Sequence, residues 1–356
     1  MIPCSQINKP IAKFDDVVLV TGANGFIGTR LVDNLLVRGF RRLRCFIRPS
    51  SNSRALEQVC SRFGHCHVEI VKGNLLSLDD CVAATKDAVA IFHLAAGRGE
   101  KSVPDAYMNS VVTTRNLLEA TRCWGTSRRF VNVSSFAVYA NTNKASWRKL
   151  DESCPVEPYP ELAGDAYCFA KVKQDEIVKE YGLRFGIPYV MVRPGYVFGP
   201  SKNAISGRVG IGSFGIFLHL GGSNRIPLTY VDNCADAIAL TGLSEGVDNQ
   251  VFNVIDDNLP TSRQFLRLYK RKVRRFSSLY LPHAASYAFC WLWESYSRWS
   301  CEQLPPAFNR KKWHTYWKNT SYSNAKLKGL GWGPHISMTE ALSRCFESWH
   351  KETAHA

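Results

Sequence analysis

The chain has 356 residues, of which 45% are hydrophobic and 21% are charged. This composition is typical of a globular protein with a large core and excludes a disordered or fibrous chain. The formal net charge of +15 favours an anionic cofactor and an anionic substrate, with a membrane surface as a further partner. Because no recognised nucleic-acid module accompanies the charge, we expect no nucleic-acid partner.

The cell compartment follows from what the sequence lacks. Residues 1–16 combine prolines with charged residues and predict no secretory signal. No apolar run is long enough to predict a transmembrane helix. The twelve cysteines are scattered without a CxxC pair, which predicts a cytoplasmic protein with reduced thiols. His65 and His67 flank Cys66, but we interpret them as part of a surface turn and predict no metal site.

Residues 17–30, VVLVTGANGFIGTR, predict a site for a pyrophosphate. A short buried strand over 17–20 precedes apolar residues at helical spacing. Three glycines between them would allow a tight turn, a close approach of the backbone to phosphates, and packing of the helix on the strand. The N–H groups at the helix start then face the anion. The predicted dinucleotide-binding residues here are Gly22, Asn24, Gly25, Phe26, Ile27 and Gly28.

The second predicted strand, 43–47, ends at Arg48. In dinucleotide folds an acid about 20 residues past the glycines binds the ribose 2′-hydroxyl. Here the next acid is Glu57, and Arg48 stands at the strand end, where a cation can pair with a 2′-phosphate. This arrangement favours NADP over NAD. The simpler alternative is a solvated arginine.

Strands and helices alternate up to residue 133, which indicates a parallel sheet covered on both faces. Strands are predicted over 67–71, 88–94 and 130–133, and helices over 79–87 and 105–122. Small residues follow the second of these strands, where a ligand can lie close to the strand ends. They give Leu94, Ala95 and Ala96 as further cofactor contacts.

The next predicted helix carries Tyr167 and Lys171, four residues apart and therefore on one face. A free tyrosine, with a pKa of about 10, is a poor base at neutral pH. A neighbouring ammonium group favours the phenolate. Tyrosine and lysine at this spacing are common, so the position of the pair after a strand that ends in Ser134 and Ser135 is what favours catalysis.

The remaining sequence completes the sheet and adds a second region. Strands are predicted over 190–193, 226–231 and 251–255, with a helix over 232–241. The glycine-rich residues 201–224 predict a mobile loop with a short helix. From Thr261 the pattern changes to basic helices and aromatic segments.

These elements predict an α/β fold, with a Rossmann-type doubly wound parallel sheet and a smaller, mostly helical C-terminal substrate lobe. We expect the dinucleotide-binding domain at 1–200, completed by 226–256. The substrate lobe is expected at 201–225 and 257–356.

Residues 279–299 concentrate three tryptophans with other aromatic side chains. Three interpretations stay open. The segment is a buried helix that roofs the substrate site, a surface helix that touches a membrane or a greasy substrate, or a partner interface. Aromatic and basic residues together suit a peripheral membrane contact.

The chain resembles the extended short-chain dehydrogenases/reductases, which include nucleotide-sugar epimerases and related dehydrogenases such as 3β-hydroxysteroid dehydrogenase and dihydroflavonol reductase types. The resemblance spans nearly the whole chain and is weak over 257–320. It rests on TGANGFIG at 21–28, HLAA at 93–96, VNVSSFAVYA at 131–140, YCFAK at 167–171, VRPGYVFGP at 192–200, TYVDNCADAI at 229–238 and NAKLKGLGW at 324–332.

This resemblance implies four catalytic-site residues. Tyr167 would be the acid/base, and Lys171 would bind the nicotinamide ribose and lower the tyrosine pKa. Ser135 would bond the substrate oxygen, and Asn109 would support the site. The resemblance also places residues against the cofactor: Asn74, Leu75, Pro194, Gly195 and Val197.

Departures from the family pattern bear on the reaction. The family's 4,6-dehydratases carry an Asp-Glu pair where this chain has Phe136 and Ala137, so we expect no elimination chemistry. Epimerases usually carry an arginine that clamps a diphosphate. Here the candidates are Arg225, one residue out of register, and Arg208, and both are also explained by solubility.

Two classes of function follow. The first is an NAD(P)-dependent oxidoreductase or epimerase that transfers hydride at a secondary alcohol or ketone carbon. Its expected substrate is a nucleotide sugar, and the alternative is a hydrophobic alcohol of steroid or flavonol type. The second class is a non-catalytic NADP-binding sensor, which would not need Ser135, Tyr167 and Lys171 together. The resemblance also implies a homodimer through the helices that contain Asn109 and Tyr167.

Overall fold

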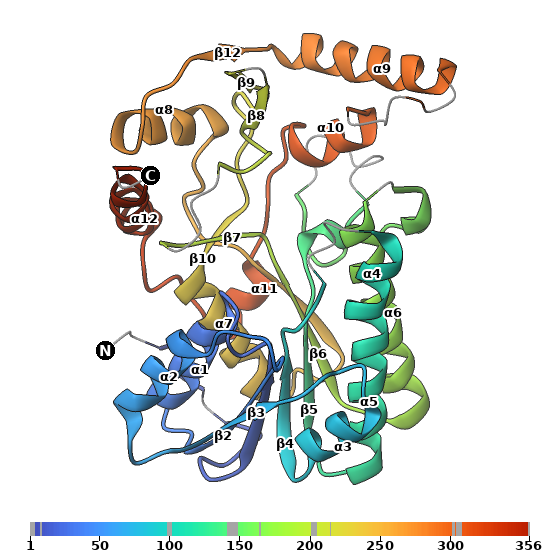
Figure 1. The fold of residues 1–356 in the computed structure, drawn as a ribbon, viewed down its shortest axis with the longest axis vertical. Coiled ribbons are helices and arrows are strands. Elements are labelled where there is room, and N and C mark those ends of the chain that lie inside the picture. Colours follow the sequence, from blue (N-terminus) through green and yellow to red (C-terminus); the bar gives the residue numbers. More distant parts are fainter. Residues whose placement is uncertain are drawn as a thin grey trace.

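The computed structural model describes residues 4–7, 9–97, 102–140, 149–163, 165–200, 205–213, 215–300, 303 and 308–354. Its centre is a seven-stranded sheet of order β11-β6-β5-β4-β1-β2-β3, in which every neighbouring pair is parallel (Figure 1). The predicted doubly wound Rossmann-type sheet is thus confirmed. The strands are β1 (Val17–Thr21), β2 (Arg42–Ile47), β3 (His67–Lys72), β4 (Ala88–His93), β5 (Arg129–Val133), β6 (Tyr189–Pro194) and β11 (Gln250–Val254).

The strands are apolar runs because helices cover both faces of the sheet. One face packs against α1 (Gly28–Val37), α2 (Arg54–Cys60) and α7 (Val231–Leu243). The other packs against α3 (Leu78–Thr85), α5 (Thr113–Trp124) and α6 (Ala166–Phe185). The chain proceeds from β1 to β2 and β3 in one direction across the sheet, and from β4 to β5 and β6 in the other. The topological switch point therefore lies between β1 and β4, and ligands of such sheets bind there, outside the carboxyl ends of the strands.

The helix predicted over 105–122 is a continuous helical run in three parts. It begins with α4 (Val103–Tyr107), passes through a π-helical turn at Met108–Val112 and ends with α5. Such π turns often occur at functional sites. This one contains Asn109, a predicted site residue.

A second group of elements, here called the upper lobe, lies above the carboxyl ends of the strands in Figure 1. It contains α8 (Ser262–Lys272), α9 (His283–Trp299), α10 (Arg310–Tyr316) and α12 (Met338–Ala354). Below them lie α11 (Ala325–Lys328) and the strand β7 (Tyr196–Phe198), which pairs with β10 (Leu228–Tyr230). Its own core joins α8 to α12 through ring contacts such as Tyr269 with Trp349.

The short helix predicted within 201–224 is wrong for the part of that segment the structure describes. β8 (Gly210–Ser213) and β9 (Ile216–His219) form an antiparallel pair there. β12 (Ser278–Tyr280), about 60 residues later in the chain, adds a third strand parallel to β9. Pairing with β12 stabilises the extended conformation of β9. Because β12 comes from a distant segment, the glycine-rich residues themselves carry no pattern that predicts these strands.

The interpretation of residues 279–299 as a buried roof is also wrong. Within α9 the buried residues are Ser286, Cys290 and Ser297. The large side chains Leu292 and Trp299 are exposed, at 58% and 78%. No helix among the described residues has the length and hydropathy needed to cross a membrane.

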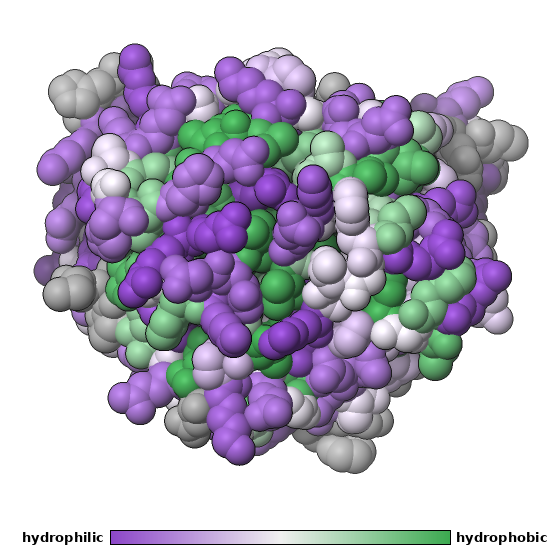
Figure 2. All heavy atoms as spheres, turned by 90° about the horizontal axis from the view of Figure 1, so that it is seen from below, coloured by the Kyte–Doolittle hydropathy of each residue, from purple (hydrophilic) through white to green (hydrophobic). Residues whose placement is uncertain are grey.

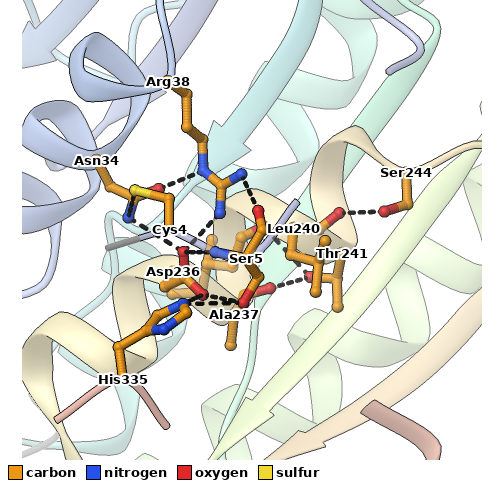
Figure 3. A network of polar contacts seen from close by, with 11 residues as sticks. Cys4, Ser5, Asn34, Arg38, Asp236, Ala237, Leu240, Thr241, Ser244 and His335 are labelled. Carbon is orange, nitrogen blue, oxygen red and sulfur yellow. Dashed lines mark hydrogen bonds and ion pairs between the residues drawn. The ribbon is translucent and has the colours of Figure 1, made fainter. Parts of the chain in front are cut away.

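The N-terminal segment is fixed to α1 and α7 by a buried polar cluster around Asp236 (Figure 3). Ser5 Oγ donates to Asp236 Oδ2 at 2.7 Å, and Arg38 pairs with Oδ1 at 2.5 Å. His335 Nε2 lies 3.3 Å from Asp236 and 3.1 Å from Ser5 Oγ. Serine and aspartate therefore share one imidazole nitrogen. A Ser-His-Asp catalytic set needs two nitrogens, so this cluster stabilises the fold.

Candidate active site

The turn after β1 is built for a close approach of the backbone. Gly22 has φ +67°, and a Cβ on it would lie 2.9 Å from the Ala95 nitrogen at the end of β4. A Cβ on Gly28 would lie 2.1 Å from the Gly22 oxygen, so the start of α1 packs directly on the turn. Gly25 is exposed, and a Cβ there would meet only the Gly22 oxygen, at 3.0 Å. The turn is thus tightly packed at Gly22 and Gly28, and it is open to solvent at Gly25.

The start of α1 favours an anion at this open side. No acidic residue lies in the first turn of α1, and Ile27 provides no side-chain cap. The positive end of the helix dipole is therefore available to phosphates. Asn24 Nδ2 donates to the Asn52 carbonyl at 3.2 Å and ties the turn to the loop after β2.

The structure brings Arg48 and Asn109 together. Arg48 Nη2 donates to Asn109 Oδ1 at 3.1 Å, although the two residues are 61 positions apart. Asn109 Nδ2 donates to the carbonyl and the carboxylate of Asp105, at 2.9 Å and 3.0 Å. Among the described contacts, Asn109 therefore lies beside the predicted 2′-phosphate residue rather than against Ser135 or Tyr167.

The other predicted cofactor residues lie at the ends of strands or just beyond them. Leu94 N donates to the Thr21 carbonyl at 3.2 Å, which aligns the ends of β4 and β1. Gly195, after β6, would place a Cβ 2.3 Å from the Pro227 oxygen, so this turn is also tightly packed. Asn74 Oδ1 accepts from the Leu76 nitrogen at 3.0 Å. Ala96 is half-buried, and Leu75 and Val197 are buried.

Tyr167 begins α6 and bonds Ser135. Asp165 caps the helix, because its Oδ1 accepts from the nitrogens of Tyr167 and Cys168 at 3.0 Å and 3.2 Å. Ser135 follows β5 in extended conformation, and its Oγ accepts from Ala137 N at 3.2 Å. Burial raises the pKa of the Tyr167 phenol, while its hydrogen bond with Ser135 acts in the opposite direction. The predicted serine–tyrosine pair thus meets in space.

Lys171 lies one turn further along α6, fully desolvated. Its Nζ donates to the Val133 carbonyl and to Gln174 Oε1, both at 2.8 Å. Burial lowers the pKa of Lys171 to about 8, against the opposing effect of Asp175. Besides burial and Ser135, the charges of Asp165 and Asp175 have the largest effects on the pKa of Tyr167, and both raise it. The predicted lowering of the tyrosine pKa by Lys171 stays a prediction.

A buried hydrogen-bond chain joins Lys171 to the glycine turn. Gln174 Nε2 donates to Thr114 Oγ1 at 2.8 Å, and Thr114 Oγ1 donates to the Ser110 carbonyl at 2.5 Å. Because the single hydroxyl proton of Thr114 is donated to Ser110, Thr114 Oγ1 must accept the other hydrogen bond, which His93 Nε2 donates at 2.8 Å. The other imidazole nitrogen, Nδ1, accepts from Thr21 Oγ1 at 2.8 Å.

Only one assignment of the protons satisfies this series of hydrogen bonds, and in it His93 is a neutral imidazole protonated on Nε2. Burial lowers the pKa of His93 to about 3, with the Lys171 charge adding to the effect. Thr21 ends β1, directly before Gly22. This series of hydrogen bonds therefore couples the position of Lys171 to the turn expected to hold the dinucleotide.

The two predicted substrate arginines lie in different places. Arg208 Nη1 donates to the Thr315 carbonyl at 2.7 Å, and its guanidinium lies 5.3 Å from the Tyr316 ring centroid. Burial raises the pKa of Tyr316, and the charge of Asp165, the residue that caps α6, adds to the effect, so Tyr316 lies near the start of α6. Arg225 instead lines a cavity of about 550 Å³ between α8 and α12, together with Arg267 and Lys272.

Sequence reasoning missed three residues of this region. Gln174 holds Lys171, Asp165 caps α6, and Tyr316 lies between Arg208 and the start of α6. An aspartate directly before the helical pattern is a recognisable N-cap signal. Gln174 and Tyr316 carry no signal in the sequence, because their roles depend on neighbours far along the chain.

Known proteins with similar sequences include nucleotide-sugar enzymes and a steroid dehydrogenase. The chain is 28% identical over 259 residues to a trifunctional UDP-glucose 4,6-dehydratase/UDP-4-keto-6-deoxy-D-glucose 3,5-epimerase/UDP-4-keto-L-rhamnose-reductase of Arabidopsis thaliana, covering 67% of this chain and 36% of that protein. It is 32% identical over 190 residues to a 3 beta-hydroxysteroid dehydrogenase/Delta 5-->4-isomerase of Mycobacterium tuberculosis, covering 51% and 47%. The matches thus span about a third to a half of these relatives.

Solved structures show the same fold over almost the whole chain. The UDP-glucuronic acid 4-epimerase of Bacillus cereus, in complex with UDP-glucuronic acid and NAD, superposes with a TM-score of 0.69 at 18% identity, covering 95% of this chain and 99% of that one. A family model matches residues 18–254, which is more than half of the chain. The chain belongs to the NAD-dependent epimerase/dehydratase family.

Proposed function

We propose that this protein is an NAD(P)-dependent oxidoreductase or epimerase that transfers hydride at a secondary alcohol or ketone carbon of a nucleotide sugar. The observation that carries the proposal is the hydrogen-bonded pair of Ser135 and Tyr167, with Lys171 one helical turn away. Ser135 follows the carboxyl end of β5 and Tyr167 lies in the first turn of α6, and the glycine turn follows the carboxyl end of the parallel strand β1. A binding module has no use for this set.

The proposed chemistry assigns one proton to Tyr167. As the substrate alcohol is oxidised, its hydroxyl proton passes to the Tyr167 phenolate oxygen, and in the reverse direction the phenol returns it. Ser135 Oγ bonds the same substrate oxygen and holds it within reach of Tyr167. A nicotinamide dinucleotide bound at the strand ends supplies the acceptor and donor of the hydride. Lys171 favours the phenolate by its charge.

The residues present fit a dinucleotide. The open side of Gly25 and the uncapped start of α1 provide the phosphate site. Gly22 and Gly28 leave no room for a Cβ, so the turn is specified by glycine at both positions. We propose that Arg48 pairs with a 2′-phosphate and selects NADP, with NAD as the alternative.

The Arg48→Ala variant is expected to bind NADP about 10- to 100-fold more weakly, because a charged hydrogen bond contributes about 1.5–3 kcal/mol. NAD, which has no 2′-phosphate, is expected to bind equally well to both proteins. Calorimetric titration of each cofactor measures the two values. Arg42→Ala, at the other end of β2 and exposed, is the matched control. Equal losses for NADP and NAD would remove the proposed role.

A nucleotide sugar is the proposed substrate for two reasons. Arg208 places a cation near the start of α6, where a diphosphate could be held. The similar structure with UDP-glucuronic acid and NAD has the same fold over 95% of this chain. Arg225, which precedes β10, lines a separate cavity.

Redox chemistry or epimerisation is favoured over dehydration. Phe136 is buried and stacks on Tyr322, with ring centroids 5.9 Å apart. This apolar packing stands where a dehydratase needs an acidic pair. The relative from Arabidopsis thaliana is named for a dehydratase as well as an epimerase and a reductase, and we expect only the latter two types of step here.

The test is a panel of UDP-, GDP- and dTDP-sugars beside steroid and flavonoid alcohols, with NAD and NADP. Absorbance at the nicotinamide band reports net redox, and proton NMR reports sugar interconversion. We expect turnover of at least one nucleotide sugar. Turnover of the hydrophobic alcohols alone would establish the second candidate, which the similarity to 3 beta-hydroxysteroid dehydrogenase supports.

Assembly and location complete the proposal. We propose a homodimer through α5 and α6, where Leu183 is 87% exposed and Phe185 is 40% exposed. We also propose a cytoplasmic location, which suits cysteines that are scattered along the sequence without a CxxC pair.

A further inference from the structure

The helix α9 leaves a large part of its apolar surface exposed to solvent. Its buried positions are Ser286, Cys290 and Ser297, at helical spacing. The opposite face presents large apolar side chains to solvent, with exposed fractions of 39% to 78%: Phe289, Trp291, Leu292, Tyr296 and Trp299. A surface helix normally buries its apolar face, so this face calls for a separate explanation.

Specific polar bonds hold α9 in this orientation. Trp313 Nε1 of α10 donates to Ser286 Oγ at 2.9 Å. Glu294 accepts from Arg310 Nε and Nη2, at 2.9 Å and 3.2 Å. Arg310 and Arg298 together lower the pKa of Glu294, the hydrogen bond to Arg310 being the largest cause. Ring contacts of Tyr287 with Trp313 and of Trp293 with Phe308 join these polar bonds on the inward face. The remaining large apolar side chains of α9 are thereby fixed outward.

The apolar surface continues beyond α9 along the top of the molecule. β12 lies between α8 and α9 at that edge (Figure 1). It exposes Leu279 and Tyr280, at 56% and 42%, and its neighbour β9 exposes Ile216 at 48%. We call this combined surface the upper apolar edge. The opposite end of the molecule is mostly hydrophilic, with its apolar side chains interrupted by polar ones (Figure 2).

Positive charge adjoins this edge. Residues 258–293 contain seven lysines and arginines and no aspartate or glutamate. The Arg263 guanidinium lies 5.0 Å from the ring centroid of exposed Tyr280. Arg274 and Arg275 are exposed and lie a few residues before β12. A two-fold contact with a second copy would bring this cationic surface near itself, so an anionic partner fits better than a copy of the chain.

We infer that the upper apolar edge binds the surface of a membrane that contains anionic lipids. Tryptophan and tyrosine favour the boundary between lipid headgroups and acyl chains, and apolar helix faces insert there while cations meet the anionic headgroups. α9 would lie in the plane of the interface, consistent with its 17 residues. This inference is independent of the proposed reaction.

The test is flotation of the full chain with vesicles of phosphatidylcholine alone and of phosphatidylcholine with phosphatidylserine. The wild type is expected to bind the anionic vesicles, more weakly at high salt, with a blue shift of tryptophan fluorescence. The triple variant Trp291→Ser, Leu292→Ser and Trp299→Ser is expected to bind them at least ~10-fold more weakly, because it loses the inserted apolar area. These side chains are exposed, so the fold should persist.

Two further variants separate the contributions. Arg274→Glu with Arg275→Glu is expected to reduce the preference for anionic vesicles by at least ~10-fold. Leu78→Ser, which removes an exposed leucine at the start of α3, is expected to bind like the wild type. Failure of the wild type to bind anionic vesicles would overturn the inference. A triple variant that binds anionic vesicles like the wild type would also overturn it. So would a triple variant whose only measured change is the dissociation of a dimer, seen by sedimentation.

Discussion

Tyr167→Phe is expected to lower kcat by about 10²- to 10⁴-fold, the usual contribution of a positioned acid/base. The variant loses only the phenol oxygen, which bonds Ser135 in the structure, so cofactor affinity should change little. The helix cap by Asp165 uses backbone nitrogens and is retained. Steady-state rates on the substrate found by the panel, with calorimetric cofactor titration, measure both quantities.

Tyr159→Phe is the matched control, because it removes a phenol oxygen from a tyrosine that is 62% exposed, a few residues before α6. Its kcat should equal that of the wild type. If Tyr167→Phe also turned over at the wild-type rate, the assignment of the acid/base would be wrong.

Asp175→Ala is expected to lower the free energy of unfolding by about 3–5 kcal/mol, the cost of leaving a buried charge without its partner. Asp175 Oδ2 accepts from Arg193 Nη2 at 2.9 Å, with side chains 3% and 2% exposed. Asp175 Oδ1 accepts from Asn132 Nδ2 at 2.9 Å. Removal of the carboxylate leaves both donors buried between α6 and the sheet. Denaturant unfolding followed by circular dichroism measures the change.

Glu180→Ala provides the comparison on the same helix. Glu180 pairs with Arg184 at 2.6 Å, but both side chains are about half exposed. Exposed pairs contribute about 0–1 kcal/mol, so this variant should unfold close to the wild type. Equal and small losses for Asp175→Ala and Glu180→Ala would show that the buried pair does not stabilise the native state.

The sheet and the meeting of Ser135 with Tyr167 could be predicted because their signals are local. Buried parallel strands appear as apolar runs, and the glycines at 22, 25 and 28 meet steric demands of one short turn. Tyr167 and Lys171 share a helix face by spacing alone. Their position after β5 then follows from the order of the chain.

The upper lobe could not be predicted in the same way. The pair β8 and β9 depends on β12, a strand from a distant segment. In α9 the aromatic residues left a buried roof as one of three interpretations. Contacts with α10, among them the bonds from Arg310 and Trp313, instead leave several of these aromatic side chains exposed. Gln174 likewise gains its role only when Thr114 and Lys171 meet in three dimensions. Such tertiary contacts override local pattern.

Transfer of deuteride to or from carbon tests the central claim most directly. The substrate alcohol identified by the panel, deuterated at the carbinol carbon that reacts, is mixed with protein loaded with the oxidised cofactor and quenched within one turnover for mass spectrometry. The account predicts deuterium on the nicotinamide of the cofactor with the wild type, and transfer slowed by about 10²-fold or more with Tyr167→Phe. A wild-type chain that binds the cofactor and converts the substrate without moving deuterium would contradict it.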